Sequence, residues 1–117
     1  MTFNQPIVTA LRRIAEALTD AGDYPKQAAS IESLLSLASS ETPSAQATFK
    51  KEITTNKWYW LGMGTIADIE LRDQKLNQKF VSAYYDLATA CEQAGYGTIY
   101  SRNLGSVFGK WLHNGHV

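Results

Sequence analysis

The chain has 117 residues, with eleven basic side chains, eleven acidic ones and a single cysteine. This length fits one domain, spanning residues 1–117, that can bury a core without disulfide bonds or metal. The balanced charge gives no overall attraction to nucleic acid or anionic lipid. Arg12 and Arg13 interrupt the apolar run near the N-terminus, which therefore lacks the pattern of a signal peptide. No stretch approaches the roughly 20 apolar residues of a membrane span, so we expect a cytoplasmic protein without a membrane partner.

Apolar residues at helical spacing predict a first helix over residues 4–21. Asn4 is its expected N-cap, and Pro6 fits its first turn. Gly22 follows the last apolar residue and is the expected C-cap.

A second helix is expected to begin at Asp23-Tyr24-Pro25, with Asp23 as its cap, because proline tolerates a helix start but not a helix interior. The short connection predicts that the first two helices pack as an antiparallel hairpin. The face expected to be buried carries Ala28, Ile31, Leu34, Leu35 and Ala38.

Turn-forming residues at 39–44 separate this pair from a third, weaker helix. Ser44 is its expected cap, and the β-branched run that ends in Thr54 and Thr55 should terminate it. A side of this helix with Phe49 and Ile53 is expected to face the core.

The strongest helical pattern covers about residues 74–94, with Gly95 as the expected C-cap and Cys91 on the apolar face. This helix should be the central packing element, lying against the first helix pair, and Cys91 should be a buried, inert thiol. In the tail, residues 104–112 have helical spacing. Gly105 and Gly109 weaken this helix, and we interpret them as sites of tight docking onto the core.

The stretch between these helices, residues 57–73, is the most distinctive. Its segment Gly62-Met63-Gly64 resembles part of a phosphate-binding loop but lacks a third glycine and a Gly-Lys-Ser/Thr step. We instead interpret it as a device that starts a helix. The glycines would permit positive φ or close contact, Thr65 would be the N-cap, and Asp68 would bond back to the cap amide.

Three adjacent aromatic residues, Trp58, Tyr59 and Trp60, precede this motif. Three neighbouring rings cannot all face one core, so at least one should be exposed or half-buried. Such rings are common at interface hot spots, but they also seal the rims of small cores. The acidic side chains that follow also have two possible roles. They can cap helices and lie on the solvated surface, or they can form a negative patch that faces a basic partner. These acids are Asp68, Glu70 and Asp73.

Catalytic and metal-binding patterns are weak. His113 and His116 could approach one metal ion, but no further ligand type lies near them in the sequence. Cys91 is expected to be buried, and neither histidine belongs to a motif for nucleophilic catalysis. We therefore expect no enzyme, no cofactor and no metal site.

The segment Leu61-Gly62-Met63-Gly64-Thr65-Ile66-Ala67-Asp68 resembles the signature of a family of small bacterial proteins, several of them encoded beside polymorphic toxins. That signature is Gly-Gly-Met-Gly-Ser-(Leu/Phe)-Asn-Asp. Gly62, Met63, Gly64 and Asp68 match it, and Thr65 stands in for serine. Leu61 and Ala67 depart from it. The resemblance implies an all-α fold and a role as an immunity protein, including antidotes to contact-dependent growth-inhibition toxins.

Together these observations predict an all-α protein, a single compact domain of about five helices in an antiparallel bundle. Our first hypothesis is an immunity protein that occludes the active or substrate-binding site of a cognate toxin domain, with a nuclease as the favoured target. Because nuclease sites are basic, the expected contacts are Trp58, Tyr59, Glu70 and Asp73. The alternative is a helical regulator that binds nucleic acid, the less favoured partner, through Lys75, Lys79, Arg102 and Lys110.

Overall fold

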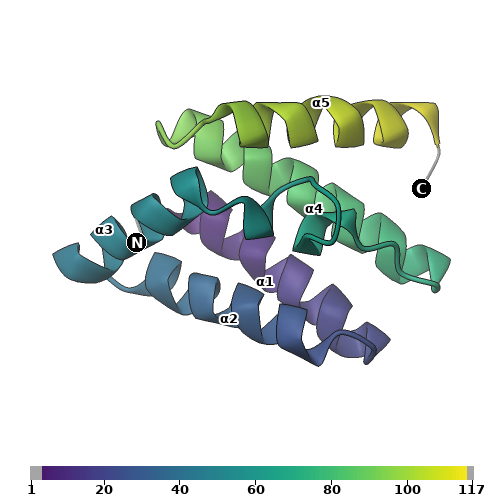
Figure 1. The fold of residues 1–117 in the computed structure, drawn as a ribbon, viewed down its shortest axis with the longest axis horizontal. Coiled ribbons are helices and arrows are strands. Elements are labelled where there is room, and N and C mark those ends of the chain that lie inside the picture. The colour runs from purple at the N-terminus through teal and green to yellow at the C-terminus, as the bar shows by residue number, and fades with distance from the viewer. Residues whose placement is uncertain (1–3, 116–117) are drawn as a thin grey trace.

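Five α-helices and two short 3-10 helices build residues 4–115, the part of the chain that the computed structural model describes (Figure 1). No strand occurs among these residues, so the all-α prediction is confirmed. The radius of gyration is 13.2 Å, close to the roughly 13 Å expected for a compact domain of this size. The elements are α1 (Gln5–Ala21), α2 (Pro25–Ser39), α3 (Pro43–Thr55), η1 (Lys57–Tyr59), η2 (Ile66–Asp68), α4 (Gln74–Gln93) and α5 (Ile99–Asn114).

Helix α4 is the central packing element, as predicted. It packs against α1 on one side and α5 on the other, whereas α2 packs against α1, and α3 against α2. Neighbours α1 and α2 run antiparallel, as do α4 and α5 (Figure 1). The sequence placed α4 against both helices of the first pair, but its main partner in that pair is α1. Within residues 4–115, no helix is both long and apolar enough to cross a bilayer.

The start of each early helix differs in detail from the prediction. Asn4 is at the N-cap position of α1, but its side chain donates to Oε1 of Gln46 at 2.7 Å and makes no capping bond. Tyr24, not Asp23, is the N-cap residue of α2. Thr42, not Ser44, caps α3 by accepting from the amide of Ala45 at 3.3 Å.

The connection between α4 and α5 ends one helix and starts the next with local hydrogen bonds. Gly95 has a φ of 83°, and the amide of Tyr96 donates to the carbonyl of Cys91 at 2.8 Å. This pattern is a Schellman motif, which satisfies carbonyls at the end of α4. Thr98 and Ser101 then form a reciprocal capping box at the start of α5, which favours a helix at this position.

Helix α5 continues through both of its glycines. A Cβ atom added to Gly109 would lie 3.0 Å from the ring of Tyr85, and one added to Gly105 would lie 3.6 Å from Cβ of Ala88. Both contacts are with α4. The interpretation of these glycines as sites of close docking is therefore confirmed, most clearly at Gly109.

The segment from residue 56 to residue 73 does not extend away from the bundle. It crosses one face of the molecule, in front of α1 and α4 and between α2 and α5 (Figure 1). Trp60, Ile66 and Leu71 from this segment are buried in the core. The Trp60 ring meets the ring of Tyr84 edge to face, with centroids 6.4 Å apart. The segment thus completes the core and is fixed on the bundle by its own apolar side chains.

Candidate functional site

The Gly-Met-Gly motif forms a closed turn. Hydroxyl Oγ1 of Thr65 donates to the carbonyl of Gly62 at 2.8 Å, and the amide of Gly64 donates to Oδ2 of Asp68 at 3.3 Å. Gly64 has a φ of 78°, so the predicted positive φ is confirmed there. Thr65 is at the predicted N-cap position, but the predicted capping bonds are wrong: its side chain makes no capping bond, and Asp68 binds the amide of Gly64 instead of the cap residue's own amide. The helix that starts here is the single 3-10 turn η2, and α4 begins only at Gln74.

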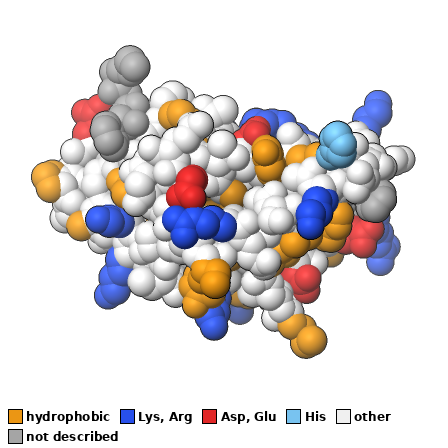
Figure 2. All heavy atoms as spheres, turned by 90° about the horizontal axis from the view of Figure 1, so that it is seen from above, with side chains coloured by type: hydrophobic (Ala, Val, Ile, Leu, Met, Phe, Trp, Pro, Cys, Tyr) orange, Lys and Arg blue, Asp and Glu red, His pale blue; other side chains and the backbone are white. Residues whose placement is uncertain are grey.

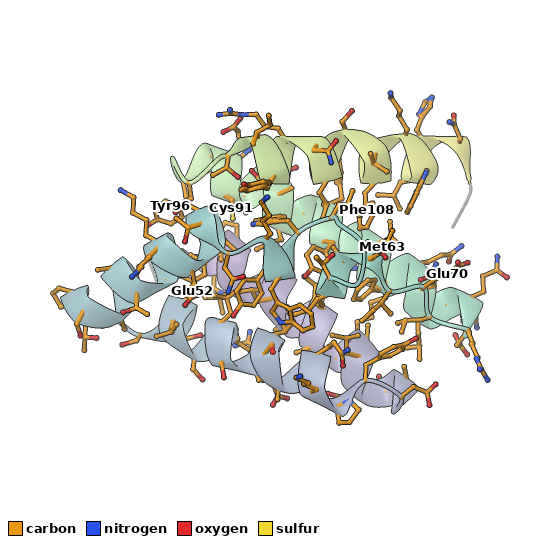
Figure 3. All side chains as sticks on the ribbon, viewed as in Figure 1. Glu52, Met63, Glu70, Cys91, Tyr96 and Phe108 are labelled. Atoms are coloured by element: carbon orange, nitrogen blue, oxygen red, sulfur yellow. The ribbon has the colours of Figure 1, made fainter. Side chains whose placement is uncertain are left out.

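Met63 is the tip of this turn, and its side chain is fully exposed. It lies on the segment that crosses the front of the bundle (Figure 3). The hydrogen bonds around it involve Gly62, Gly64, Thr65 and Asp68, so the turn holds its shape without any packing of the methionine. The Met63 side chain therefore adds no packing to the turn, and it presents an apolar group to solvent.

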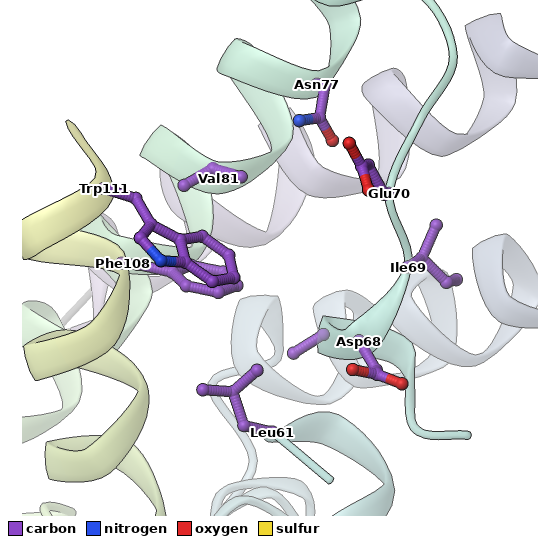
Figure 4. A pocket seen from close by; sticks show the side chains of 9 residues that line it. Leu61, Asp68, Ile69, Glu70, Asn77, Val81, Phe108 and Trp111 are labelled. Carbon is purple, nitrogen blue, oxygen red and sulfur yellow. The ribbon is translucent and has the colours of Figure 1, made fainter. Parts of the chain in front are cut away.

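A pocket of about 350 Å³ opens beside this turn, where the crossing segment meets α4 and α5. Figure 4 shows the lining side chains arranged around the pocket, with Phe108 and Trp111 opposite Asp68, Ile69 and Glu70. Leu61 and Asp68, which flank the Gly-Met-Gly turn in the chain, both line it. The described residues that line it are Leu61, Ala67, Asp68, Ile69, Glu70, Asn77, Val81, Phe108 and Trp111.

The α5 wall of the pocket is aromatic. The rings of Phe108 and Trp111 are stacked, with centroids 5.1 Å apart and planes 24° apart. Phe108 is buried in the core, whereas 38% of Trp111 is exposed. Because one face of the indole lies on Phe108, a ligand can reach only its other face and its edges. The stacked pair thus supplies a supported aromatic surface.

The opposite wall carries two carboxylates. Glu70 is exposed and has no hydrogen bond or ion pair with any described residue, whereas one oxygen of Asp68 accepts the amide of Gly64. The amide of Leu71, next to Glu70, donates to Oδ1 of Asn77 in α4 at 3.0 Å. This buried bond fixes the wall on α4. Among residues 4–115, no lysine, arginine or histidine belongs to the lining, so the described pocket has an aromatic wall and an acidic wall.

The structure places the four predicted partner contacts in different surroundings. Of the four, only Glu70 lines the pocket. Trp58 is half-buried against the core, which agrees with the expectation that at least one of the three rings would not be fully buried.

Tyr59 is only 8% exposed, and burial, with the nearby Glu52 carboxylate, raises its pKa. It therefore has little surface for a partner, which corrects its assignment as a contact. Asp73 is exposed but caps α4, accepting the amide of Leu76 at 3.0 Å.

Phe108 and Trp111 were expected only as part of an apolar helical stripe. Their spacing of three residues places them on one side of α5, which is the available sequence signal. Trp111 is exposed at the end of this stripe because of the position in which α5 docks on the bundle. The sequence gives no such information.

Two of the four basic residues proposed to bind nucleic acid pair with acidic side chains. Nζ of Lys79 pairs with Glu16 at 3.5 Å, and Nε of Arg102 pairs with Glu92 at 2.7 Å. On the side that carries α5, acidic and basic side chains are interspersed with hydrophobic ones (Figure 2). Half of the four residues predicted to bind nucleic acid thus already have a carboxylate partner.

The other candidate groups lie apart from the pocket. Cys91 is wholly buried, as predicted, and burial raises the pKa of its thiol to about 12. His113 is exposed near the end of α5, and His116 lies outside the described residues. Within residues 4–115, no group of three or more histidine, cysteine, aspartate or glutamate side chains is arranged to hold a metal ion. Comparisons with protein-family models, curated proteins and solved structures found no match to this chain.

Proposed function

We propose that this chain is a protein-binding inhibitor of the immunity-protein type, which neutralises a cognate bacterial toxin domain by covering its active or substrate-binding site. The observation that carries the proposal is the pocket between the crossing segment and α5, with Glu70, which pairs with no residue in the described part of the chain, on one wall and the exposed Trp111 on the other. The resemblance of residues 61–68 to the immunity-protein signature supports the same role.

The surface around the pocket combines features that favour protein contacts. Tryptophan and methionine are enriched at interfaces, and here Trp111 is stacked on Phe108 while Met63 projects from a hydrogen-bonded turn. A partner's apolar side chains can bury both without any rearrangement of the fold. Hydrogen bonds within the turn and the stacking of Trp111 on Phe108 hold the backbone and the indole in place, which lowers the entropic cost of binding there, whereas the exposed Met63 side chain still has to be ordered by the partner.

The area required is modest. The described surface totals 6610 Å², and a standard interface uses about 800 Å² per partner. One face of the bundle, centred on the pocket, is large enough. Inhibition by occlusion requires no reaction from this chain.

Charge favours a basic partner. Glu70 and Asp68 lie on the pocket without a neighbouring lysine or arginine in the lining. Toxin nucleases bind phosphates with basic side chains, and complementary charge speeds association and excludes wrong partners. A nuclease acts on nucleic acid within the cell, so the inhibitor we propose would work in the cytoplasm.

The test is co-expression of the tagged chain with the products of the adjacent open reading frames. We expect one product to be toxic alone, to co-purify with this chain and to lose its toxicity in its presence. Met63→Ala and Trp111→Ala should weaken the complex, whereas Glu41→Ala, an exposed change between α2 and α3, should not. If no adjacent product binds, the proposal is wrong. Salt-sensitive binding of the chain to DNA or RNA would support the nucleic-acid regulator instead.

A further inference from the structure

We propose that the pocket receives a single arginine side chain of the partner protein. This inference rests on the proposed function, because it names the group by which a protein partner would be anchored. It depends on three properties of the pocket: its size, its aromatic wall and its uncompensated carboxylates.

The size of the pocket limits its occupant. At about 350 Å³, it is near the lower end of the roughly 300–1,000 Å³ typical of ligand sites. This space accepts one long side chain but not a helix or an extended strand. The occupant is therefore a single projecting residue.

The aromatic wall favours a planar cation. Phe108 covers one face of the Trp111 indole, and 38% of Trp111 is exposed. A guanidinium group can stack on an indole and is more weakly hydrated than an ammonium group, so it loses less on leaving water. Arginine fits this wall better than lysine.

The opposite wall gives the cation its counter-charge. Glu70 has both carboxylate oxygens available, and Asp68 has one that does not accept the amide of Gly64. A guanidinium group can bind a carboxylate through two parallel hydrogen bonds. A neutral apolar side chain would instead remove these carboxylates from water without a partner, which is unfavourable. Charge complementarity thus selects arginine over leucine or phenylalanine.

The probe that tests this inference is N-acetyl-arginine amide, titrated into the ¹⁵N-labelled chain at low salt and followed by NMR. We expect saturable shifts of the Trp111 indole N–H and of the amides of Ile69, Glu70 and Val81. The citrulline analogue, which is neutral and nearly the same shape, should bind at least about tenfold more weakly because it lacks the charge-assisted bonds.

Two variants and one control assign the effect to this pocket. Glu70→Gln is an exposed, nearly isosteric change that leaves the fold intact, and it should weaken binding of the arginine amide by about tenfold. Trp111→Leu should reduce binding as well, because it removes the stacking surface. Glu41→Gln removes an exposed charge elsewhere and should leave binding unchanged.

The inference is overturned if the arginine amide causes no shifts at the pocket, if citrulline binds equally well, or if Glu70→Gln has no effect. These outcomes are separable from failure of the proposed function. A chain that neutralises a toxin but ignores the arginine amide, and whose complex tolerates Glu70→Gln, retains the proposed function and loses the arginine pocket. A chain that binds the arginine amide as described but neither binds nor neutralises any adjacent gene product retains the pocket and loses the proposed function.

Discussion

The indole Nε1 of Trp60 donates a hydrogen bond to the backbone carbonyl of Ile53 at 2.8 Å, and both residues are fully buried. Ile53 lies in the last turn of α3, where carbonyls have no partner within the helix. The indole supplies that partner while its ring fills the core against Tyr84. One side chain therefore satisfies a carbonyl at the end of α3 and anchors the segment that forms the acidic wall of the pocket.

Trp60→Phe should destabilise the fold strongly. Phenylalanine cannot donate to the carbonyl of Ile53, and an unsatisfied buried acceptor costs about 1–3 kcal/mol. The smaller ring also leaves a cavity, which adds to the loss. The measurement is the free energy of unfolding in urea. Trp58→Phe is the matched control, because Trp58 is only half-buried and its change should cost less. Equal losses in the two variants would contradict the role given to Trp60.

Gly64→Val should destabilise the turn that displays Met63. Gly64 has a φ of 78°, and a Cβ atom there would meet no atom within 4 Å. The cost is therefore backbone strain, about 1–2 kcal/mol for a side chain in the left-handed region, and not steric contact. Gly64→Asn should restore much of the loss, since asparagine tolerates this conformation. Thermal unfolding of both variants tests this, and equal melting temperatures for Gly64→Val and the natural chain would rule out the backbone role.

The sequence predicted the helices well because their apolar spacing is a local signal. It predicted the N-cap residues less well because each turn contains several polar residues that could occupy the N-cap position. In the turn before α3, Pro43 and Ser44 follow Thr42. Proline fits the first helical position, so the helix begins at Pro43 and the preceding threonine becomes the cap. Ser44, one residue inside the helix, cannot do so.

The candidate site was only half predictable. Glu70 could be named because acids after an aromatic run form a pattern within one stretch. Trp111 is far away in the sequence and joins Glu70 only because α5 docks beside the crossing segment. Tyr59 was misassigned because a sequence cannot show which of three adjacent rings enters the core. Both errors concern tertiary packing, which local periodicity does not encode.

Gly105→Ala should stabilise the protein. Alanine is favoured over glycine in a helix interior by about 0.5–1 kcal/mol, and the new Cβ would lie at an ordinary 3.6 Å from Ala88. Gly109→Ala should gain less or lose stability, because its Cβ would lie 3.0 Å from the Tyr85 ring. Urea unfolding of the two single variants tests this difference. Adding Tyr85→Ala should remove the loss of stability caused by Gly109→Ala. If the effects of the two substitutions on the free energy of unfolding simply add, the contact between residue 109 and the Tyr85 ring is not tight.

Asp73→Asn separates capping from partner binding. The Asp73 side chain accepts the amide of Leu76 at the start of α4, and asparagine caps as well as aspartate. The variant should therefore keep the stability of the natural chain, whereas Asp73→Ala should lose about 1 kcal/mol. If Asp73 also contacts a basic partner, Asp73→Asn should weaken the complex without changing the melting temperature. Equal affinity of Asp73→Asn and the natural chain would restrict Asp73 to its capping role.

The Cys91 thiol should make stability fall at alkaline pH. Burial raises its pKa from the ordinary 9.0 to about 12. Between these values the unfolded chain releases the thiol proton while the folded chain retains it. The unfolded state then binds fewer protons, so the free energy of unfolding decreases as pH rises, by up to about 1.4 kcal/mol per pH unit.

Cys91→Ala isolates this contribution. The variant leaves a cavity and should be less stable than the natural chain at pH 7. Because it has no thiol to titrate, the stability gap between the two should narrow as pH rises above 9, while the buried Tyr84 contributes equally to both. Urea unfolding of both chains at pH 7, 8, 9 and 10 measures the gap. A gap that stays constant over this range, or rapid alkylation of Cys91 in the native protein, would mean that the thiol is not enclosed between the helices.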